Sequence, residues 1–451
     1  MNLRPSKIKS RPTGFIAGVL LWIMASATLL GQIPGYNPPN QFTLKNGLKV
    51  IVYEDDSLPI VSVVLAYAVG SKNDPENKAG LAFLMQHLMF QGSKNVSTMQ
   101  HINYIQNTGG ELNAATLFDR TFFYETVPAN QLGLIFWLES DRMSSLDINE
   151  VTVNRVKEML INNENQRRIQ EPYSRYFFLV DEILFPDYSY GHALTGSSDS
   201  LDRITVEDVL TFYRRYYVPN NAVLCVSGDV KTARVRELAA RYFETLPRGP
   251  EPVSQPTADF SSIFSSRDQI TFDPLISVPA LQFGLRFDGV KKEEYLLFRL
   301  LENILVNGKR SRLYHRLVNK ERLALFFNGG LENRGEYLSL KLFLTANNQL
   351  MIDKAKKAIV DEFNRLKTEM ISERELVRAK TKYKMDYFSR LAGNNLSRAL
   401  TLAEYYLQEG DLPDVNQELT SLKRVNSYSI LALARRYLRE ENYCFISIMP
   451  R

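Results

Sequence analysis

Apolar residues recur along the chain with two spacings, which separate its predicted strands from its predicted helices. Residues 48–53, 60–69 and 280–287 alternate apolar with polar positions or run in β-branched residues, as strands do. Apolar residues three and four positions apart indicate one face of a helix instead, as in the stripe from Ile352 to Leu366. Most such stripes predict core packing rather than contacts to a cofactor.

The same patterns place further elements in both halves of the chain. A strand is predicted at 112–124, after the break at Gly109-Gly110. The other predicted helices span 80–92, 99–108, 128–142, 151–169 and 293–306. Because strands are grouped with helices in each half, we expect the α+β class, with a mainly antiparallel sheet flanked by helices in each half.

One unit of helix, turn and hydrophobic strand occurs twice. Arg214-Arg215-Tyr216 precedes the strand-like run 222–227, and Arg435-Arg436-Tyr437 precedes the run 442–447. The matched arginines are 221 residues apart (435 minus 214), and Cys225 and Cys444 within the two runs are 219 apart (444 minus 225). This periodicity predicts two homologous domains. Cysteines in two different cores do not meet, so no disulfide is expected.

Length and proline content divide the chain in the same way. A chain of 451 residues is too long for one hydrophobic core. The stretch 248–267 carries several prolines and serines, which neither continue helices nor fill strand ladders, and is predicted to be a linker. The predicted domains are therefore 41–247 and 268–451.

The first residues predict export. Residues 1–27 carry four basic groups and no acid, and the uncharged run 14–31 contains the small-residue step Ala25-Ser26-Ala27. This pattern is typical of a secretory signal peptide, cleaved after Ala27, and predicts an exported protein of the bacterial periplasm. The alternative is an uncleaved anchor, in which case the protein would be attached to a membrane.

The leader accounts for most of the net charge. The whole chain is formally +5, and removal of the four basic groups of residues 1–27 leaves +1. A mature chain that is so nearly neutral lacks the basic surface that nucleic acid requires, so nucleic acid is excluded as a partner.

The run from Gly80 to Ser93 holds the most informative chemistry. Zinc peptidases of the inverzincin type carry H-x-x-E-H on such a helix, because imidazoles at i and i+4 face one metal and the glutamate takes a proton from the bound water. The corresponding positions here begin with Phe83 and end with Gln86 and His87. One histidine of the pair is present, and the base position holds a neutral amide.

Three segments together resemble the pitrilysin and mitochondrial-processing-peptidase family. Gly80 to Ser93 is similar to G-L-A-H-x-x-E-H-x-x-F-x-G-[ST] except at positions 83 and 86, and Gly109 to Thr116 is similar to G-G-x-x-N-A-x-T. Asn163 to Arg168 resembles the N-E-R-R-Q run, which contains the third zinc ligand. The resemblance covers nearly the whole mature chain and implies two domains that face each other as a clamshell around a peptide chamber.

The resemblance implies a degenerate metal site. His87 and Glu164, which are 77 residues apart (164 minus 87), are the remnant ligands, Phe83 replaces the first ligand, and Gln86 stands at the general-base position. Zinc catalysis requires three protein ligands and an open position. We therefore expect no catalytic residue and no cofactor, and zinc enters only in the alternative of an atypical metal site.

The other histidines and one lysine bear on that alternative. His101 or His192 could supply a third ligand, although both lie outside the motif helix, and His315 is predicted to lie at a surface or interface. Lys157 occupies a position where many relatives have a further acid. It either opposes metal binding or belongs to a solvated helical face.

The second half lacks the polar pair of active relatives. They use an arginine and, seven residues later, a tyrosine to stabilise the charged intermediate. Ser311 to Leu317 resembles their S-R-L-[FY]-x-x-L, which places Val318 at the arginine and Leu325 at the tyrosine. Some bacterial relatives work as pairs, one chain bearing the zinc motif and its partner the polar pair, and this chain departs from both patterns.

The peptide-binding frame remains. In relatives, the segment matching 110–116 is an edge strand that pairs with extended substrate, and Asn113 is the predicted substrate-binding side chain. The expected function is a pseudopeptidase, a non-catalytic subunit or peptide-binding partner of an active zinc-bearing family member. The alternatives are a zinc metalloendopeptidase with an atypical site and a structural subunit of a membrane-associated assembly.

Overall fold

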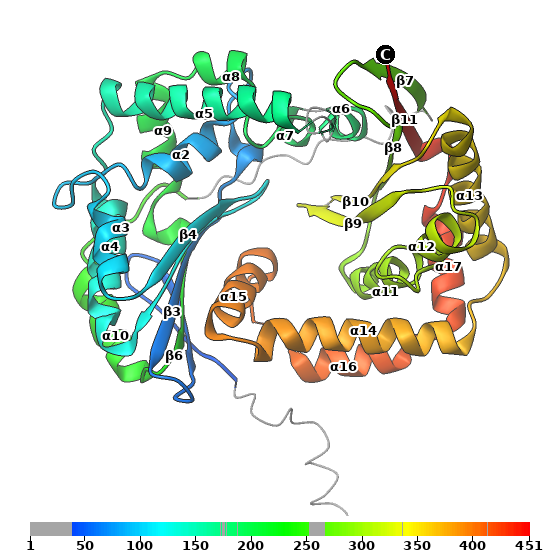
Figure 1. Ribbon diagram of the computed structural model, residues 1–451. Coiled ribbons are helices and arrows are strands. Elements are labelled where there is room, and N and C mark those ends of the chain that lie inside the picture. The colour runs from blue at the N-terminus through cyan, green and yellow to red at the C-terminus, as the bar shows by residue number, and fades with distance from the viewer. Residues whose placement is uncertain are drawn as a thin grey trace, which may run out of the picture.

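The computed structural model describes residues 38–171, 173, 176, 178–186, 188–251, 267–335, 337–412 and 414–451. The leader predicted at 1–27 and most of the linker predicted at 248–267 lie outside these residues. The described residues form two β-sheets with helices around them (Figure 1). None of the helices in these ranges has the length and apolar character needed to cross a bilayer.

The first sheet has six strands in the order β1-β2-β6-β3-β5-β4. Only β2 and β6 run parallel, and all other neighbours are antiparallel. β4 therefore forms one edge of the sheet. The strands are β1 (Asn40–Thr43), β2 (Lys49–Glu54), β3 (Ile60–Tyr67), β4 (Glu111–Thr116), β5 (Thr121–Pro128) and β6 (Ala222–Gly228).

The second sheet repeats this order as β7-β11-β8-β10-β9. Here too a single pair, β7 with β11, is parallel. Each strand of the second sheet has a counterpart in the first, and within the described residues β1 of the first sheet has no counterpart in the second. The strands are β7 (Arg267–Asp273), β8 (Ala280–Phe287), β9 (Phe326–Arg334), β10 (Tyr337–Thr345) and β11 (Tyr443–Pro450). The predicted fold class, two homologous α+β domains with mainly antiparallel sheets, is confirmed.

Helices follow the strands in matching places in the two halves. Those of the first half are α2 (Leu81–Leu88), α3 (Gln100–Asn107), α4 (Leu132–Ser144), α5 (Glu150–Gln170), α6 (Leu179–Leu184), α7 (Tyr188–Gly191), α8 (Ser198–Asp202), α9 (Val206–Tyr216) and α10 (Thr232–Phe243). Those of the second half are α11 (Tyr295–Leu305), α12 (Arg312–Tyr314), a π-helix at His315–Lys320, α13 (Gln349–Thr368), α14 (Glu373–Ala392), α15 (Asn395–Glu409), α16 (Val415–Arg424) and α17 (Ser427–Tyr437).

The internal repeat reappears in space. The two Arg-Arg-Tyr segments end α9 and α17, and each helix leads through a 3₁₀ turn into a central strand, β6 or β11. Cys225 on β6 and Cys444 on β11 are both buried and unpaired, in different hydrophobic clusters. The sequence offset thus marks equivalent positions in two sheets.

Each half lends a helix to the sheet of the other half. α15 packs against β3 and β6 of the first sheet, while α6 packs against β8 and β11 of the second (Figure 1). Along β3, Val61, Val63 and Leu65 face the helices of the first half, and Val64 and Ala66 face the cluster that contains α15. β3 is buried on both faces, which explains why its sequence runs apolar instead of alternating strictly.

One predicted strand is wrong in extent. Residues 112–124 form a hairpin, because the chain turns between β4 and β5, where the Leu117 N–H donates to the Arg120 carbonyl at 2.8 Å. The turn contains neither glycine nor proline, and Asp119 is its one residue of a type that turns favour. Asp119 stabilises it instead by accepting hydrogen bonds from Tyr190 and from the Gly335 N–H of the second half.

Candidate functional site

The motif helix α2 begins on a buried carboxylate. Gly80 precedes it in the left-handed region (φ +96°), and Asp74 accepts the N–H groups of Gly80 and Ala82 at 2.7 and 2.8 Å. Burial raises the pKa of Asp74 to about 8, against the lowering effect of these hydrogen bonds. Leu84 and Met85 are buried against the first sheet, so the positions of the zinc motif lie on the half-buried face of the helix.

His87 and Phe83 contact each other on this face. The Nδ1 atom of His87 lies 2.9 Å from the Phe83 carbonyl oxygen, and the two rings meet edge to face with centroids 4.7 Å apart. Burial lowers the pKa of His87, which favours the neutral imidazole. An Nδ1–H bonded to a carbonyl leaves Nε2 with its lone pair, as in metal-binding histidines. The neighbouring Phe83 offers no ligand atom.

Gln86, at the position of the general base, bonds to the edge strand. Its Oε1 accepts a hydrogen bond from Thr116 Oγ1 on β4 at 2.8 Å. A neutral amide does not take a proton from water near neutral pH. The side chain therefore links α2 to the end of β4 and supplies no base.

Glu164 lies on α5, which packs against α2, but its carboxylate is already paired. Oε2 accepts from Arg167 at 2.7 Å and Oε1 from Arg168 Nε at 3.2 Å. Two guanidinium groups from the same helix thus neutralise the carboxylate, as a bound metal ion would. A zinc site requires three ligands and an open position, and this donor set does not fit one.

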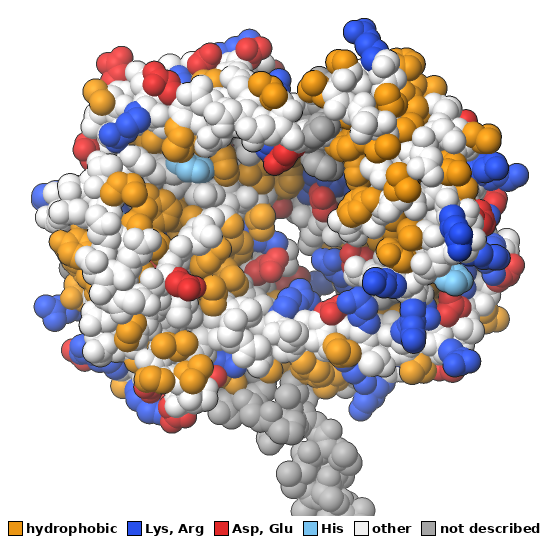
Figure 2. Space-filling model, in the orientation of Figure 1, with side chains coloured by type: hydrophobic (Ala, Val, Ile, Leu, Met, Phe, Trp, Pro, Cys, Tyr) orange, Lys and Arg blue, Asp and Glu red, His pale blue; other side chains and the backbone are white. Residues whose placement is uncertain are grey.

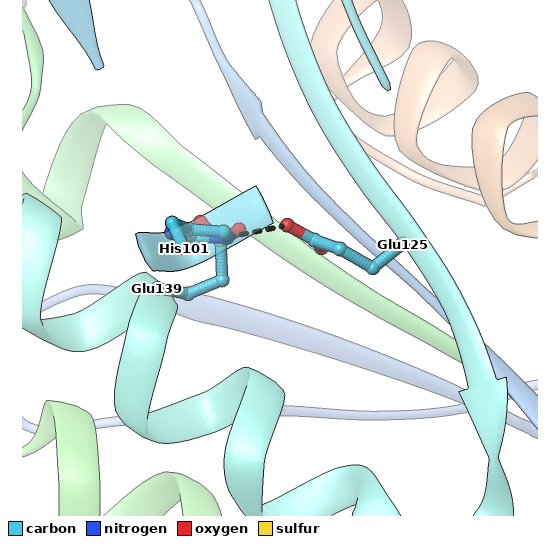
Figure 3. A group of neighbouring side chains, drawn as sticks. All are labelled: His101, Glu125 and Glu139. Atoms are coloured by element: carbon cyan, nitrogen blue, oxygen red, sulfur yellow. Dashed lines mark hydrogen bonds and ion pairs between the residues drawn. The ribbon is translucent and has the colours of Figure 1, made fainter. Parts of the chain in front are cut away.

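The described residues contain one group of three metal-binding side chains with mutually close ligand atoms, and it lies elsewhere. His101 of α3, Glu125 of β5 and Glu139 of α4 place one ligand atom each within 4.8 Å of the others (Figure 3). All three are almost fully buried. Neither His87 nor Glu164 belongs to this group, so His101 does not complete the motif.

An arginine supplies the cation of this buried group. Arg142 Nε donates to Glu139 at 2.9 Å, and its Nη2 bonds both Glu139 and Glu125. Burial, together with the charge of Arg142, lowers the pKa of His101 to about 3. Burial raises the pKa of Glu139 to about 8, although Arg142 opposes this. The group is therefore a charge cluster that ties α3, β5 and α4 together.

The remaining histidines and Lys157 have other contacts. The ring nitrogens of His192 lie 3.0 and 3.1 Å from the carbonyl oxygens of Ala193 and Ser71, and His315 is exposed on the π-helix. Lys157 donates to the carbonyl oxygens of Asp202, the last residue of α8, and of Ile204, two residues further on, at 3.0 and 2.8 Å. Lys157 thus binds a helix end, which neither sequence interpretation anticipates.

Two apolar side chains, Val318 and Leu325, stand at the positions of the distal polar pair. Val318 lies on the π-helix and packs against the core of the second half. Leu325 is 57% exposed, and its N–H donates to the Thr345 carbonyl at 2.8 Å. Neither side chain has a group that stabilises an oxyanion.

Asn113 lies on the edge strand, as the resemblance implies. β4 pairs with β5 on one side only, and the side chain of Asn113 is exposed. Its Oδ1 accepts the Ala114 N–H at 2.8 Å. The structure thus presents an accessible strand edge beside the motif helix.

A cavity of about 1650 Å³ lies between the two halves. Figure 2 shows the surface hollowed at its centre, with acidic and basic side chains around the hollow. Lys72, Asp119 and Arg120 line it from the first half, and Tyr295, Tyr383 and Glu404 from the second. His87, Gln86 and Glu164 do not line it, so the motif helix is set apart from this space.

Comparison with known proteins identifies the family of this chain. The model of "Insulinase (Peptidase family M16)" matches residues 49–195, and that of "Peptidase M16 inactive domain" matches residues 203–383. The zinc protease PqqE of Helicobacter pylori is 26% identical over 98% of both chains.

Two solved structures show the same fold. The crystal structure of a protease from Helicobacter pylori superposes with a TM-score of 0.86 and 24% identity, covering 92% of this chain and all of that one. The periplasmic protease PqqL of Escherichia coli superposes with a TM-score of 0.74 and 19% identity, over 92% of this chain and 48% of its own. The two family models follow one another along the chain, and the relatives and structures agree with them. This chain belongs to peptidase family M16.

Proposed function

We propose that this chain is a non-catalytic member of family M16 that binds extended peptide and acts as a subunit or partner of an active zinc peptidase. The contacts of the motif residues carry this proposal. Gln86 bonds to Thr116, Glu164 is held by two arginines, and Phe83 offers no ligand atom. His87 alone keeps an available ligand atom, which is too few for catalytic zinc.

The second half supports the same conclusion. Active relatives stabilise the charged intermediate with an arginine and a tyrosine, whereas Val318 packs into core and Leu325 carries no polar atom. This chain lacks both the zinc motif and the arginine–tyrosine pair. It therefore cannot supply the missing pair to a partner that has only the zinc motif. The partner is therefore expected to be complete in itself.

The edge of β4 supports peptide binding. An exposed strand edge presents backbone donors and acceptors to an added strand, and this mode of recognition needs no catalytic group. Asn113 lies at the middle of this edge, so its exposed side chain adjoins the path of an added strand. The cavity between the two halves leaves room for a polypeptide near the tip of the same hairpin.

We further propose that the protein is exported. The basic leader with its Ala25-Ser26-Ala27 step supports this, and the Escherichia coli protein of the same fold is described as periplasmic. An active M16 peptidase in the same compartment is the expected partner. The mature N-terminus, determined by mass spectrometry of the secreted protein, tests the cleavage after Ala27.

Metal content combined with cleavage tests the central proposal. The mature chain is purified without chelators, equilibrated with excess zinc and dialysed, and its zinc content and its cleavage of a quenched fluorescent peptide are measured. We expect no retained zinc and no chelator-sensitive cleavage. About one zinc per chain, with cleavage that His87→Ala abolishes, would instead establish an atypical metalloendopeptidase.

Solution mass tests the partnership. The chain is mixed with an active M16 peptidase encoded by the same organism, and light scattering measures the mass of the mixture. A hetero-oligomer that the single proteins do not form supports the proposal. Two unchanged masses across micromolar concentrations contradict it.

A further inference from the structure

The two sheets each end in an edge strand, but the backbone of the two edges is closed to different extents. In an antiparallel pair, the N–H groups of alternate residues point into the ladder and the others point outward. On β4 the Ala114 N–H donates to Asn113 Oδ1 at 2.8 Å, so it belongs to the outward set. One of the outward N–H groups of β4, that of Ala114, is therefore already hydrogen-bonded to the Asn113 side chain.

β9 is the counterpart of β4 in the second sheet, and two side chains occupy its edge. The Gly329 N–H donates to Asn328 Oδ1 at 2.8 Å, in the same way as on β4. The next outward N–H, that of Leu331, donates to Glu302 Oε1 of α11 at 2.9 Å. Glu302 is largely buried and is also paired with Arg299 at 3.1 Å. The helix thus closes β9 with a buried carboxylate that is not easily displaced.

The link between α2 and β4 is different. Gln86 bonds to the hydroxyl of Thr116 and not to a backbone N–H of the strand. It holds the end of β4 in place and leaves the backbone to the edge. Among the residues that the structure describes, the side chain that caps a backbone N–H of this edge is that of Asn113, which is exposed and bonds to the residue beside it.

We propose that Asn113 is a displaceable cap on the peptide-binding edge, which an arriving strand must push aside before it pairs with Ala114. This inference rests on the proposed function and adds a regulatory role for this side chain. When the cap leaves, the Ala114 N–H donates to a peptide carbonyl and the Asn113 amide turns to solvent. The cap protects the empty edge from unspecific strand addition. When a peptide binds, the Ala114 N–H exchanges its hydrogen bond to Asn113 for one to the peptide.

Peptide affinity measures the cap. The probe is a fluorescein-labelled peptide of alternating threonine and valine with two terminal lysines, and its binding is followed by fluorescence anisotropy. We expect Asn113→Ala to bind it about fivefold more tightly than the unchanged chain, the equivalent of one ordinary hydrogen bond. The same peptide with alternate N-methyl groups cannot form the ladder, and we expect it not to bind.

Asn328→Ala is the matched control. It removes the same kind of cap from β9, where Glu302 still closes the edge, so the affinity is expected to stay within twofold of the unchanged chain. Affinity that is unchanged or weaker in Asn113→Ala overturns the cap and leaves the proposed function intact. Absence of binding in both the unchanged chain and Asn113→Ala overturns the proposed function, and the cap with it.

Amide exchange provides a second readout that does not depend on the peptide. In the unliganded chain, the Ala114 amide is expected to exchange about tenfold faster after Asn113→Ala, whereas the inward amides of β4 keep their rates. Equal exchange of Ala114 in both proteins would overturn the cap. Circular dichroism confirms that the variant is folded, which the exposure of Asn113 predicts.

Discussion

Each half of the molecule contains a cluster of arginine and glutamate side chains around a buried carboxylate, and the two clusters are built differently. In the first half one guanidinium, that of Arg142, serves two buried carboxylates, Glu125 and Glu139. In the second half one buried carboxylate, Glu362, has three arginines within 4.0 Å, namely Arg312, Arg316 and Arg365. The arginines of the second cluster also pair with carboxylates nearer the surface, Glu321, Asp361, Glu369 and Glu375, whereas Arg142 is enclosed with its two partners in the core.

The difference appears in how the carboxylates hold their protons. Burial raises the pKa of Glu139 to about 8, because this effect and the neighbouring Glu125 together outweigh the lowering by Arg142. Burial also raises the pKa of Glu375, beside the second cluster, but hydrogen bonds and charge from Arg312 outweigh it and the pKa falls to about 2. The two halves are therefore expected to respond to substitution and to pH in opposite ways.

Removal of the single arginine is expected to have the largest effect. Arg142→Met leaves Glu125 and Glu139 without the buried cation that they share and should lower the free energy of unfolding by about 3 to 5 kcal/mol. Denaturant titration followed by circular dichroism measures it. Arg365→Met in the second half is the control, with a loss below about 1 kcal/mol, since Arg365 is half exposed and two arginines remain. Equal losses would remove the contrast between the clusters.

The pH dependence should separate the halves. Between pH 4.5 and about 8, the folded chain keeps a proton on Glu139 that the unfolded chain has released, so stability falls as pH rises, by up to about 1.4 kcal/mol per unit. Glu375 has the opposite sign, because its contribution is present above pH 4.5 and is lost as pH falls toward 2.

Glu139→Gln tests this assignment. The variant should flatten the decline of stability between pH 5 and 8, measured by denaturant titration at each pH, and leave the acid limb unchanged. Asp74, whose pKa burial also raises to about 8, contributes the slope that remains. A decline as steep as in the unchanged chain would show that Glu139 is ionised in the folded state.

Opening the edge of the second sheet should lower the free energy of unfolding by a smaller amount. Glu302→Leu removes the acceptor of the Leu331 N–H and the partner of Arg299, and is expected to lower the free energy of unfolding by about 2 kcal/mol. Glu302→Gln keeps an acceptor for the N–H and should lose about half as much. Thermal unfolding of the three proteins at one protein concentration decides this. A neutral Glu302→Leu would mean that β9 is open like β4.

The link at the first edge should have the smallest effect. Gln86→Leu removes the acceptor of Thr116 and is expected to cost about 1 kcal/mol. Gln86→Glu retains an acceptor and should be near neutral at pH 7. Combining Gln86→Leu with Thr116→Val should add no further loss, because one hydrogen bond joins both residues, and additive losses in this double-mutant cycle would contradict the link.

Much of the fold can be predicted from local pattern. The strands β2, β3 and β8 and the helix stripe of α13 follow from apolar periodicity, because each buries a face whose spacing the sequence records. Local pattern does not predict the turn between β4 and β5, because Asp119 stabilises it through contacts with Tyr190 and Gly335, which are far away in the sequence. Such tertiary stabilisation leaves no mark in the turn sequence itself.

The candidate site divides in the same way. The positions 83, 86, 87 and 164 can be located by resemblance, whereas their present contacts cannot. The bond from Thr116 to Gln86 and those from Lys157 to the carbonyls at the end of α8 depend on how helices and strands meet. The buried arrangement of His101 with two glutamates also brings together residues from three elements, and neither its spacing nor its composition signals it.

The exchange of α6 and α15 has a consequence for synthesis. The inner face of the first sheet, which includes Ile51, Val64 and Val223, is covered by a helix that begins at Asn395. During translation this face is therefore without its cover until most of the chain has been made. Contacts so distant in sequence slow folding and expose apolar surface meanwhile. The nascent first half is thus expected to depend on a chaperone, and a chain truncated before α15 should aggregate rather than fold.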